Sequence, residues 1–164
     1  MKDFPSWLPH MISIDGEWTK VLALLYGIFE KDFKQMQRFF EGRPIWWDRR
    51  VLGNEKYEEG FWHLITVTHV KTGQRLLEPR RAERLPWCGP TISNSNDGAV
   101  KVWDYREAKG HVRTYLWLEY WDYVVILEKR KQQKGEIAFL ITAFLVDWDS
   151  SRRNLKGKFS RREL

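Results

Sequence analysis

After Gly60 the chain is a succession of short segments rich in β-branched and aromatic residues. These segments cover residues 61–70, 100–105, 112–119, 123–128 and 137–147. Runs of this length and composition are typical of β-strands. The charged segment EKRKQQKGE separates the last two runs, and a connection this short joins antiparallel neighbours. The sequence therefore predicts an antiparallel sheet of four or five strands.

Before these segments, apolar residues recur at spacings of three and four, which is the pattern of an amphipathic helix that packs on a core. They are Trp18, Val21, Leu22, Leu25, Ile28, Phe29, Phe33, Met36 and Phe40. We expect this helix to end before Gly42 and an irregular connection to follow over residues 43–59. Residues 149–162, with Leu155 and Phe159 four apart, predict a short basic helix. The expected fold is α+β, with an N-terminal helix or helices and a short C-terminal basic helix, and with the helices packed on one face of the sheet.

No internal repeat, low-complexity tract or linker interrupts the chain, so we interpret residues 1–164 as a single domain. A domain of about 150 residues buries roughly 70% of the surface of its unfolded chain, so one core is sufficient. Cys88 is the only cysteine, which excludes an internal disulfide and fits a reducing compartment. Neither a signal-peptide pattern nor an apolar run of membrane-spanning length is present. We expect a cytoplasmic protein without a membrane partner.

The charge balance favours a polyanionic partner. Lysine and arginine number 28 against 22 aspartates and glutamates, a net charge of +6. Six basic residues and no acidic one lie between Arg152 and Arg162, and a second cluster consists of Arg80, Arg81 and Arg84. Either cluster alone is also compatible with ordinary solvated surface charge. The ten tryptophans predict either a dense aromatic core or an exposed surface on which bases stack.

The residues available for chemistry are histidine, arginine, lysine and hydroxyl groups. His63 and His69 lie on the first predicted strand at an even separation, so both are expected on one face. Histidine is the commonest general acid or base, although a lone strand histidine is often only structural. No metal-ligand spacing, glycine-rich phosphate loop, nucleophile elbow or dinucleotide motif is present, so we expect neither a metal nor a cofactor. This set of residues suits phosphodiester transfer without a metal ion.

Five strings of the sequence together resemble a phage- and prophage-associated family. They are GFWHLIT, EPRRAERLPW, VKVW, RTYLWLEYWDYVVIL and FLITAFLVD, and the resemblance runs from about Trp18 to Phe159. That family is placed with barnase, EndoU, the colicin-type tRNases and the RelE-like toxins. The resemblance implies N-terminal helices, a four- or five-stranded antiparallel sheet, and a metal-independent RNA-cleaving site on that sheet.

The resemblance also implies roles for individual residues. His63 matches the histidine of the FWHL string, a general base or acid. Arg80, Arg81 and Arg84 match phosphate ligands in the RRAER string, and Thr142 matches a threonine that bonds the phosphate or orients another side chain. Each has a purely structural alternative: the arginines can pair with nearby glutamates, and Thr142 can bond a neighbouring carbonyl.

Further residues are candidates for binding the substrate. Arg113 matches the arginine that opens the RxxLWL strand, and Lys156 and Lys158 match a basic tail. Tyr115 and Trp117 share a face with Arg113 on an ideal strand and can stack on an unpaired base, although such aromatics more often belong to the core.

The sequence departs from the family pattern at two places. Phe159 stands where an aromatic hydroxyl is expected. Ser150 and Ser151 stand in the segment where a histidine is expected after the last strand. Both departures concern catalysis rather than fold.

Three hypotheses follow for function. The first is an endoribonuclease, a toxin or phage-conflict effector, that cleaves tRNA, mRNA or ribosome-associated RNA to a cyclic phosphate; an antitoxin or a host protein is a candidate partner. It predicts that His63→Ala and Arg84→Ala proteins fold but do not cleave. The second is a non-catalytic RNA- or ribosome-binding module, and the third is a phage accessory protein that binds a host protein through its tryptophans.

Overall fold

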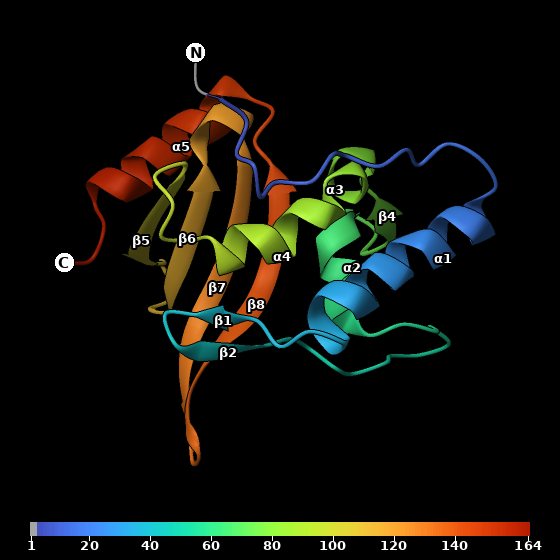
Figure 1. Cartoon of the computed structure of the whole chain (residues 1–164), viewed down its shortest axis with the longest axis horizontal. Helices are drawn as coiled ribbons and strands as arrows, with labels where there is room; N and C mark the ends of the chain where they lie inside the picture. Colours follow the sequence, from blue (N-terminus) through green and yellow to red (C-terminus); the bar gives the residue numbers. More distant parts are fainter. Residues whose placement is uncertain (1–2) are drawn as a thin grey trace.

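A six-stranded sheet forms the centre of the computed structural model, which describes residues 3–164 (Figure 1). The strands lie in the order β1-β2-β8-β7-β6-β5. Their bounds, in that order, are Phe39–Phe40, Arg43–Trp46, Gly135–Leu145, Tyr123–Gln132, Val112–Leu118 and Val100–Arg106. A separate two-stranded sheet consists of β3 (Thr66–Thr68) and β4 (Arg75–Leu77).

Strands β5 to β8 form the predicted antiparallel meander. The charged segment between β7 and β8 is a hairpin, as expected, but its strands are longer than predicted. Gln132 pairs with Gly135, so the turn itself consists only of Gln133 and Lys134. Most of the charged segment is therefore paired strand that extends beyond the core.

The sheet differs from the prediction at its β8 edge, where two short strands lie in the region expected to contain helix and irregular chain. Phe40 and Ile45 are almost fully buried, and β2 pairs with β8 in parallel. The predicted α+β class is confirmed, but the sheet has six strands instead of four or five, and one pair is parallel. A pair of short strands held by two buried apolar side chains leaves no periodic pattern in the sequence.

The N-terminal stripe forms helix α1 (Trp18–Phe29) and a π-helical turn (Glu30–Lys34), and the helix does not continue to Phe40. Val21, Leu25, Phe29 and Phe33 are buried, as predicted. The ends of the predicted stripe behave differently, since Trp18 is 45% exposed and Met36 is 47% exposed.

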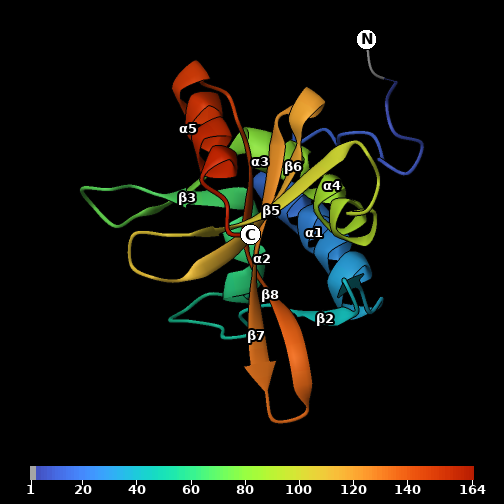
Figure 2. The same cartoon turned by 90° about the vertical axis from the view of Figure 1, so that its left-hand side faces the viewer.

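Helices cover both faces of the sheet, so the expectation that they pack on one face is wrong. Figure 2 shows α5 (Asp149–Ser160) on one side, with α1 and α4 (Leu85–Ser93) on the other. Strand β6 explains this arrangement because its side chains are apolar on both faces. Leu116 and Leu118 belong to the larger core, whereas Trp117 packs in a second core with Leu155 of α5.

The first half of the segment predicted as the first strand is helix. Helix α2 (Glu59–Ile65) contains His63, and β3 follows it. Phe61, Trp62, Leu64 and Ile65 are all buried, so the helix is apolar around most of its circumference. A short run of this kind cannot be distinguished from a buried strand by periodicity. Helices α2 and α3 (Pro79–Glu83) pack beside the C-terminal half of β8, which β2 does not reach.

The longest helices among residues 3–164 have 12 residues each, and no helix there is long and apolar enough to cross a membrane.

Candidate functional site

Three of the predicted catalytic residues line one cavity of about 580 Å³ beside β8. His63 comes from α2, Arg81 from α3 and Thr142 from β8. We call this space the His63 cavity, and its lining consists of Glu59, His63, Thr66, Val67, Thr68, Arg75, Arg81, Ile141 and Thr142.

Hydrogen bonds fix these three residues relative to one another. Arg81 Nη1 donates to the carbonyl oxygens of His63 (3.3 Å) and Thr66 (2.9 Å) and to Thr142 Oγ1 (3.3 Å). Thr142 Oγ1 donates in turn to the His63 carbonyl over 2.9 Å. The hydroxyl has one proton, which this bond uses. Thr142 therefore positions Arg81 and α2.

The imidazole of His63 is partly open to the cavity, with 42% of the side chain exposed. Burial lowers its pKa below the ordinary value, an effect only partly opposed by the nearby carboxylates of Glu59 and Asp48. The folded protein therefore favours the neutral imidazole, which has a ring nitrogen able to accept a proton.

Glu59 and Arg75 are functional candidates that sequence reasoning missed. Arg75 Nη2 donates to both carboxylate oxygens of Glu59, at 2.7 and 2.9 Å, and Glu59 Oε1 lies 3.9 Å from His63 Nε2. Glu59 is 5% exposed, so this ion pair is held within the wall of the cavity. The signal was the four-residue spacing of Glu59 and His63, which places both on one helix face. This helical spacing went unrecognised because residues 61–70 were predicted to form a strand.

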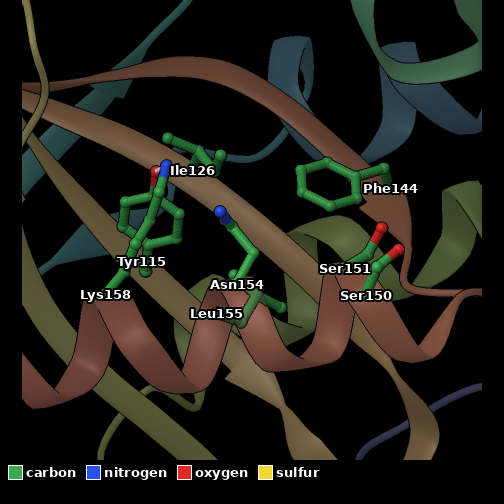
Figure 3. A pocket seen from close by; sticks show the side chains of 8 residues that line it. All are labelled: Tyr115, Ile126, Phe144, Ser150, Ser151, Asn154, Leu155 and Lys158. Atoms are coloured by element: carbon green, nitrogen blue, oxygen red, sulfur yellow. Dashed lines mark hydrogen bonds between the residues drawn. The ribbon is translucent and has the colours of Figure 1, made fainter.

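Two further cavities follow, one adjoining the first and the other adjoining the second. The Arg80 cavity, of about 260 Å³, is lined by Val67, Glu78, Arg80, Arg81, Phe144, Leu145, Asp147, Trp148 and Ser151. The Asn154 cavity, of about 430 Å³, lies between the sheet and α5 and is lined by Tyr115, Ile126, Phe144, Ser150, Ser151, Asn154, Leu155 and Lys158 (Figure 3). Arg80 Nη1 donates to Asp147 Oδ2 over 2.6 Å, so this predicted phosphate ligand is ion-paired.

Two other predicted arginines do not line the His63 cavity. Arg84 Nη1 donates to the Arg80 carbonyl, and its guanidinium lies 5.5 Å from the centre of the Trp87 ring. Arg113 is paired with Glu128, with 3.2 Å between Nε and Oε2. Arg84 Nη1 also lies 3.9 Å from Glu83 Oε2, which fits the structural alternative of a nearby glutamate partner.

The predicted stacking residues are buried. Trp117 has no exposed surface and Tyr115 only 3%. The expected stacking on an unpaired base is therefore incorrect for both rings, because their faces are covered by the second core. The Tyr115 hydroxyl donates to Glu107, and burial raises its pKa.

The predicted basic tail lies on α5. Lys158 reaches the far end of the Asn154 cavity, where its Nζ donates to Tyr115 Oη (2.8 Å) and Glu107 Oε2 (3.1 Å). Lys156 is exposed on the helix and does not line that cavity. Phe159 packs edge-on against Trp103, and it lines neither of the two cavities nearest His63.

Cys88 is fully buried, and burial raises the pKa of its thiol to about 12. It therefore has the properties of a core side chain and not of a nucleophile. Within residues 3–164, no group of three or more His, Cys, Asp or Glu side chains is arranged to hold a metal ion.

Comparisons with protein-family models, with curated proteins and with solved structures find no match for this chain. Its function is therefore inferred from the geometry of the His63 cavity and from the resemblance carried by its sequence strings.

Proposed function

We propose that this protein is an endoribonuclease that cleaves RNA by attack of a ribose 2′-hydroxyl on the adjacent phosphate. The observation that carries the proposal is the meeting of His63, Arg81 and Thr142, from three separate elements, in one cavity. Such a reaction needs a base for the 2′-hydroxyl and cations for the charge that develops on the phosphate.

His63 is the residue best suited to act as the base. Its imidazole is favoured in the neutral form and is accessible from the cavity. It takes the proton of the 2′-hydroxyl as the O2′–P bond forms and the P–O5′ bond breaks. The products are a 2′,3′-cyclic phosphate and a 5′-hydroxyl that takes its proton from water. The Glu59 carboxylate, 3.9 Å from Nε2, stabilises the imidazolium that results.

Arg81 supplies positive charge to the phosphate. All of its hydrogen bonds within residues 3–164 come from Nη1. These bonds hold the planar group in one orientation, and its other N–H groups can contact phosphoryl oxygens. A cation that is already oriented needs no reorganisation during the reaction.

The test is incubation of purified protein with a mixed-sequence RNA oligonucleotide in EDTA, followed by analysis of fragment ends. We expect fragments ending in cyclic phosphate, and none from RNA with 2′-deoxy sugars. His63→Ala should fold and lose cleavage by about 10²-fold or more, the contribution typical of a general base. His111→Ala is the matched control, because His111 is exposed and does not line the cavity. Equal activity of wild type and His63→Ala would refute the assignment.

A binding module without catalysis is the second candidate. His63 is the only histidine among the residues that line the His63 cavity. The family resemblance implies a second histidine in the segment after the last strand, but Ser151 of that segment lines the neighbouring Arg80 cavity instead. This candidate predicts RNA binding whose logarithmic affinity falls linearly with the logarithm of salt concentration, without any product.

A further inference from the structure

The His63 cavity is the first part of a longer groove. It shares Val67 and Arg81 with the Arg80 cavity, and the Arg80 cavity shares Phe144 and Ser151 with the Asn154 cavity. The three spaces therefore follow one another along β8 towards α5. Arg81 lies where the His63 and Arg80 cavities meet, and its guanidinium is 5.7 Å from the centre of the Phe144 ring, which lines the Arg80 cavity.

The far end of the groove has the chemistry of a nucleobase site. Ile126, Phe144 and Leu155 provide its apolar lining, and Asn154 projects from α5 into the space (Figure 3). Its volume of about 430 Å³ lies within the usual range for small-ligand sites. Among residues 3–164, the side chains of Asn154 and Ser150 form no hydrogen bond with the protein, so their polar groups are open to a ligand. An amide both donates and accepts, as the edge of a base requires.

Trp148 stands in the wall of the middle cavity, between the two ends of the groove. It is 68% exposed, an unusual state for so large an apolar ring. Exposed aromatic rings are surfaces on which unpaired bases stack. The side chain of Arg80, 51% exposed, lines the same cavity and can exchange Asp147 for a phosphate.

We propose that this groove binds single-stranded RNA, with the base of a nucleotide next to the scissile phosphate stacked on Trp148 and the following base in the Asn154 cavity. The inference rests on the proposed function, because the position of the scissile phosphate is taken from His63 and Arg81. It goes beyond that function by naming the substrate as an unpaired strand that occupies sites outside the His63 cavity. Duplex RNA is a poor fit, because its bases are stacked and unavailable to Trp148.

The test measures how affinity depends on RNA length, in the His63→Ala background so that the RNA stays intact. Fluorescently labelled dinucleotide and octanucleotide RNAs of the same 5′ sequence are compared by anisotropy. We expect the octanucleotide to bind more tightly, and Trp148→Ala to weaken its binding by about tenfold, within the range measured for loss of one stacked base. Asn154→Ala should also reduce the advantage of the longer RNA.

Two controls match these variants. Trp46→Ala removes a tryptophan that is 43% exposed on β2, outside the groove, and Asn96→Ala removes an exposed asparagine. Both should keep the full dependence on length. Octanucleotide binding that is unchanged by Trp148→Ala and Asn154→Ala would overturn the proposed groove.

The proposed cleavage is scored separately, with wild-type protein. If the wild-type protein cleaves RNA but Trp148→Ala does not change octanucleotide binding, the proposed groove is refuted and the proposed cleavage is not. Loss of binding in Trp148→Ala, in a protein whose wild type cleaves no RNA, supports the groove and refutes the catalytic assignment.

Discussion

Arg81 Nη1 donates a hydrogen bond to Thr142 Oγ1 over 3.3 Å, and both side chains also donate to the carbonyl of His63. These bonds tie α3, β8 and α2 together at one point. The catalytic candidates are therefore also structural residues, and their substitution has effects on stability as well as on cleavage.

Replacement of Arg81 should separate these two roles. Arg81→Ala leaves the carbonyls of His63 and Thr66 without this donor, and we expect a loss of about 1–3 kcal/mol in the free energy of unfolding. Urea denaturation measures that change. Arg81→Lys retains the charge and should recover part of the stability, yet cleave less well because lysine has no planar fork. Full cleavage by a folded Arg81→Ala protein would show that the guanidinium does not contact the phosphate.

The cleavage rate should rise with pH and then level off. Burial lowers the pKa of His63 below its ordinary value of 6.5, and the base acts in its neutral form. The rate is therefore low at pH values below that lowered pKa and constant above pH 7. Initial rates between about pH 4.5 and pH 8 measure this profile. A rate that falls as pH rises through this window would instead assign His63 the role of an acid.

Glu59→Gln should move that profile to lower pH. The Glu59 carboxylate raises the pKa of His63, whereas Arg75, its ion-pair partner, lowers it. A neutral glutamine removes the negative charge of Glu59 and leaves the positive charge of Arg75, so the pKa of His63 falls further. The limb of the pH profile and an NMR titration of the imidazole should shift together. A shift to higher pH would contradict the arrangement of charges described for the cavity wall.

Two glycine substitutions should have opposite effects on stability. A Cβ at Gly89 in α4 would lie 2.6 Å from Nε of Arg38, a buried side chain. Gly89→Ala should therefore destabilise the protein by about 1–3 kcal/mol, as overpacking does. Gly27 in α1 has nothing within 4 Å of such a Cβ, and Gly27→Ala should stabilise by roughly 0.5–1 kcal/mol. Thermal melts of both proteins provide the comparison, and equal melting temperatures would refute it.

Much of the fold was predictable because its determinants are local. The runs around Val102, Leu116, Val125 and Leu140 form strands β5 to β8, and the charged segment between the last two is a hairpin. Their periodicity and turn residues are set by neighbours in the chain. The edge strands at Phe40 and Ile45 were not predictable, because β2 pairs with β8 about a hundred residues away and β1 in turn pairs with β2.

The candidate site shows the same division. The sequence by itself supplied His63, Arg81 and Thr142, through residue types and a family resemblance. Only the tertiary structure decided that α2 is a helix, that Glu59 and Arg75 stand beside His63, and that Arg84 and Trp117 are held elsewhere. The reason is physical: periodicity records which side of an element is buried, whereas the meeting of side chains from α2, α3 and β8 depends on how separate elements pack.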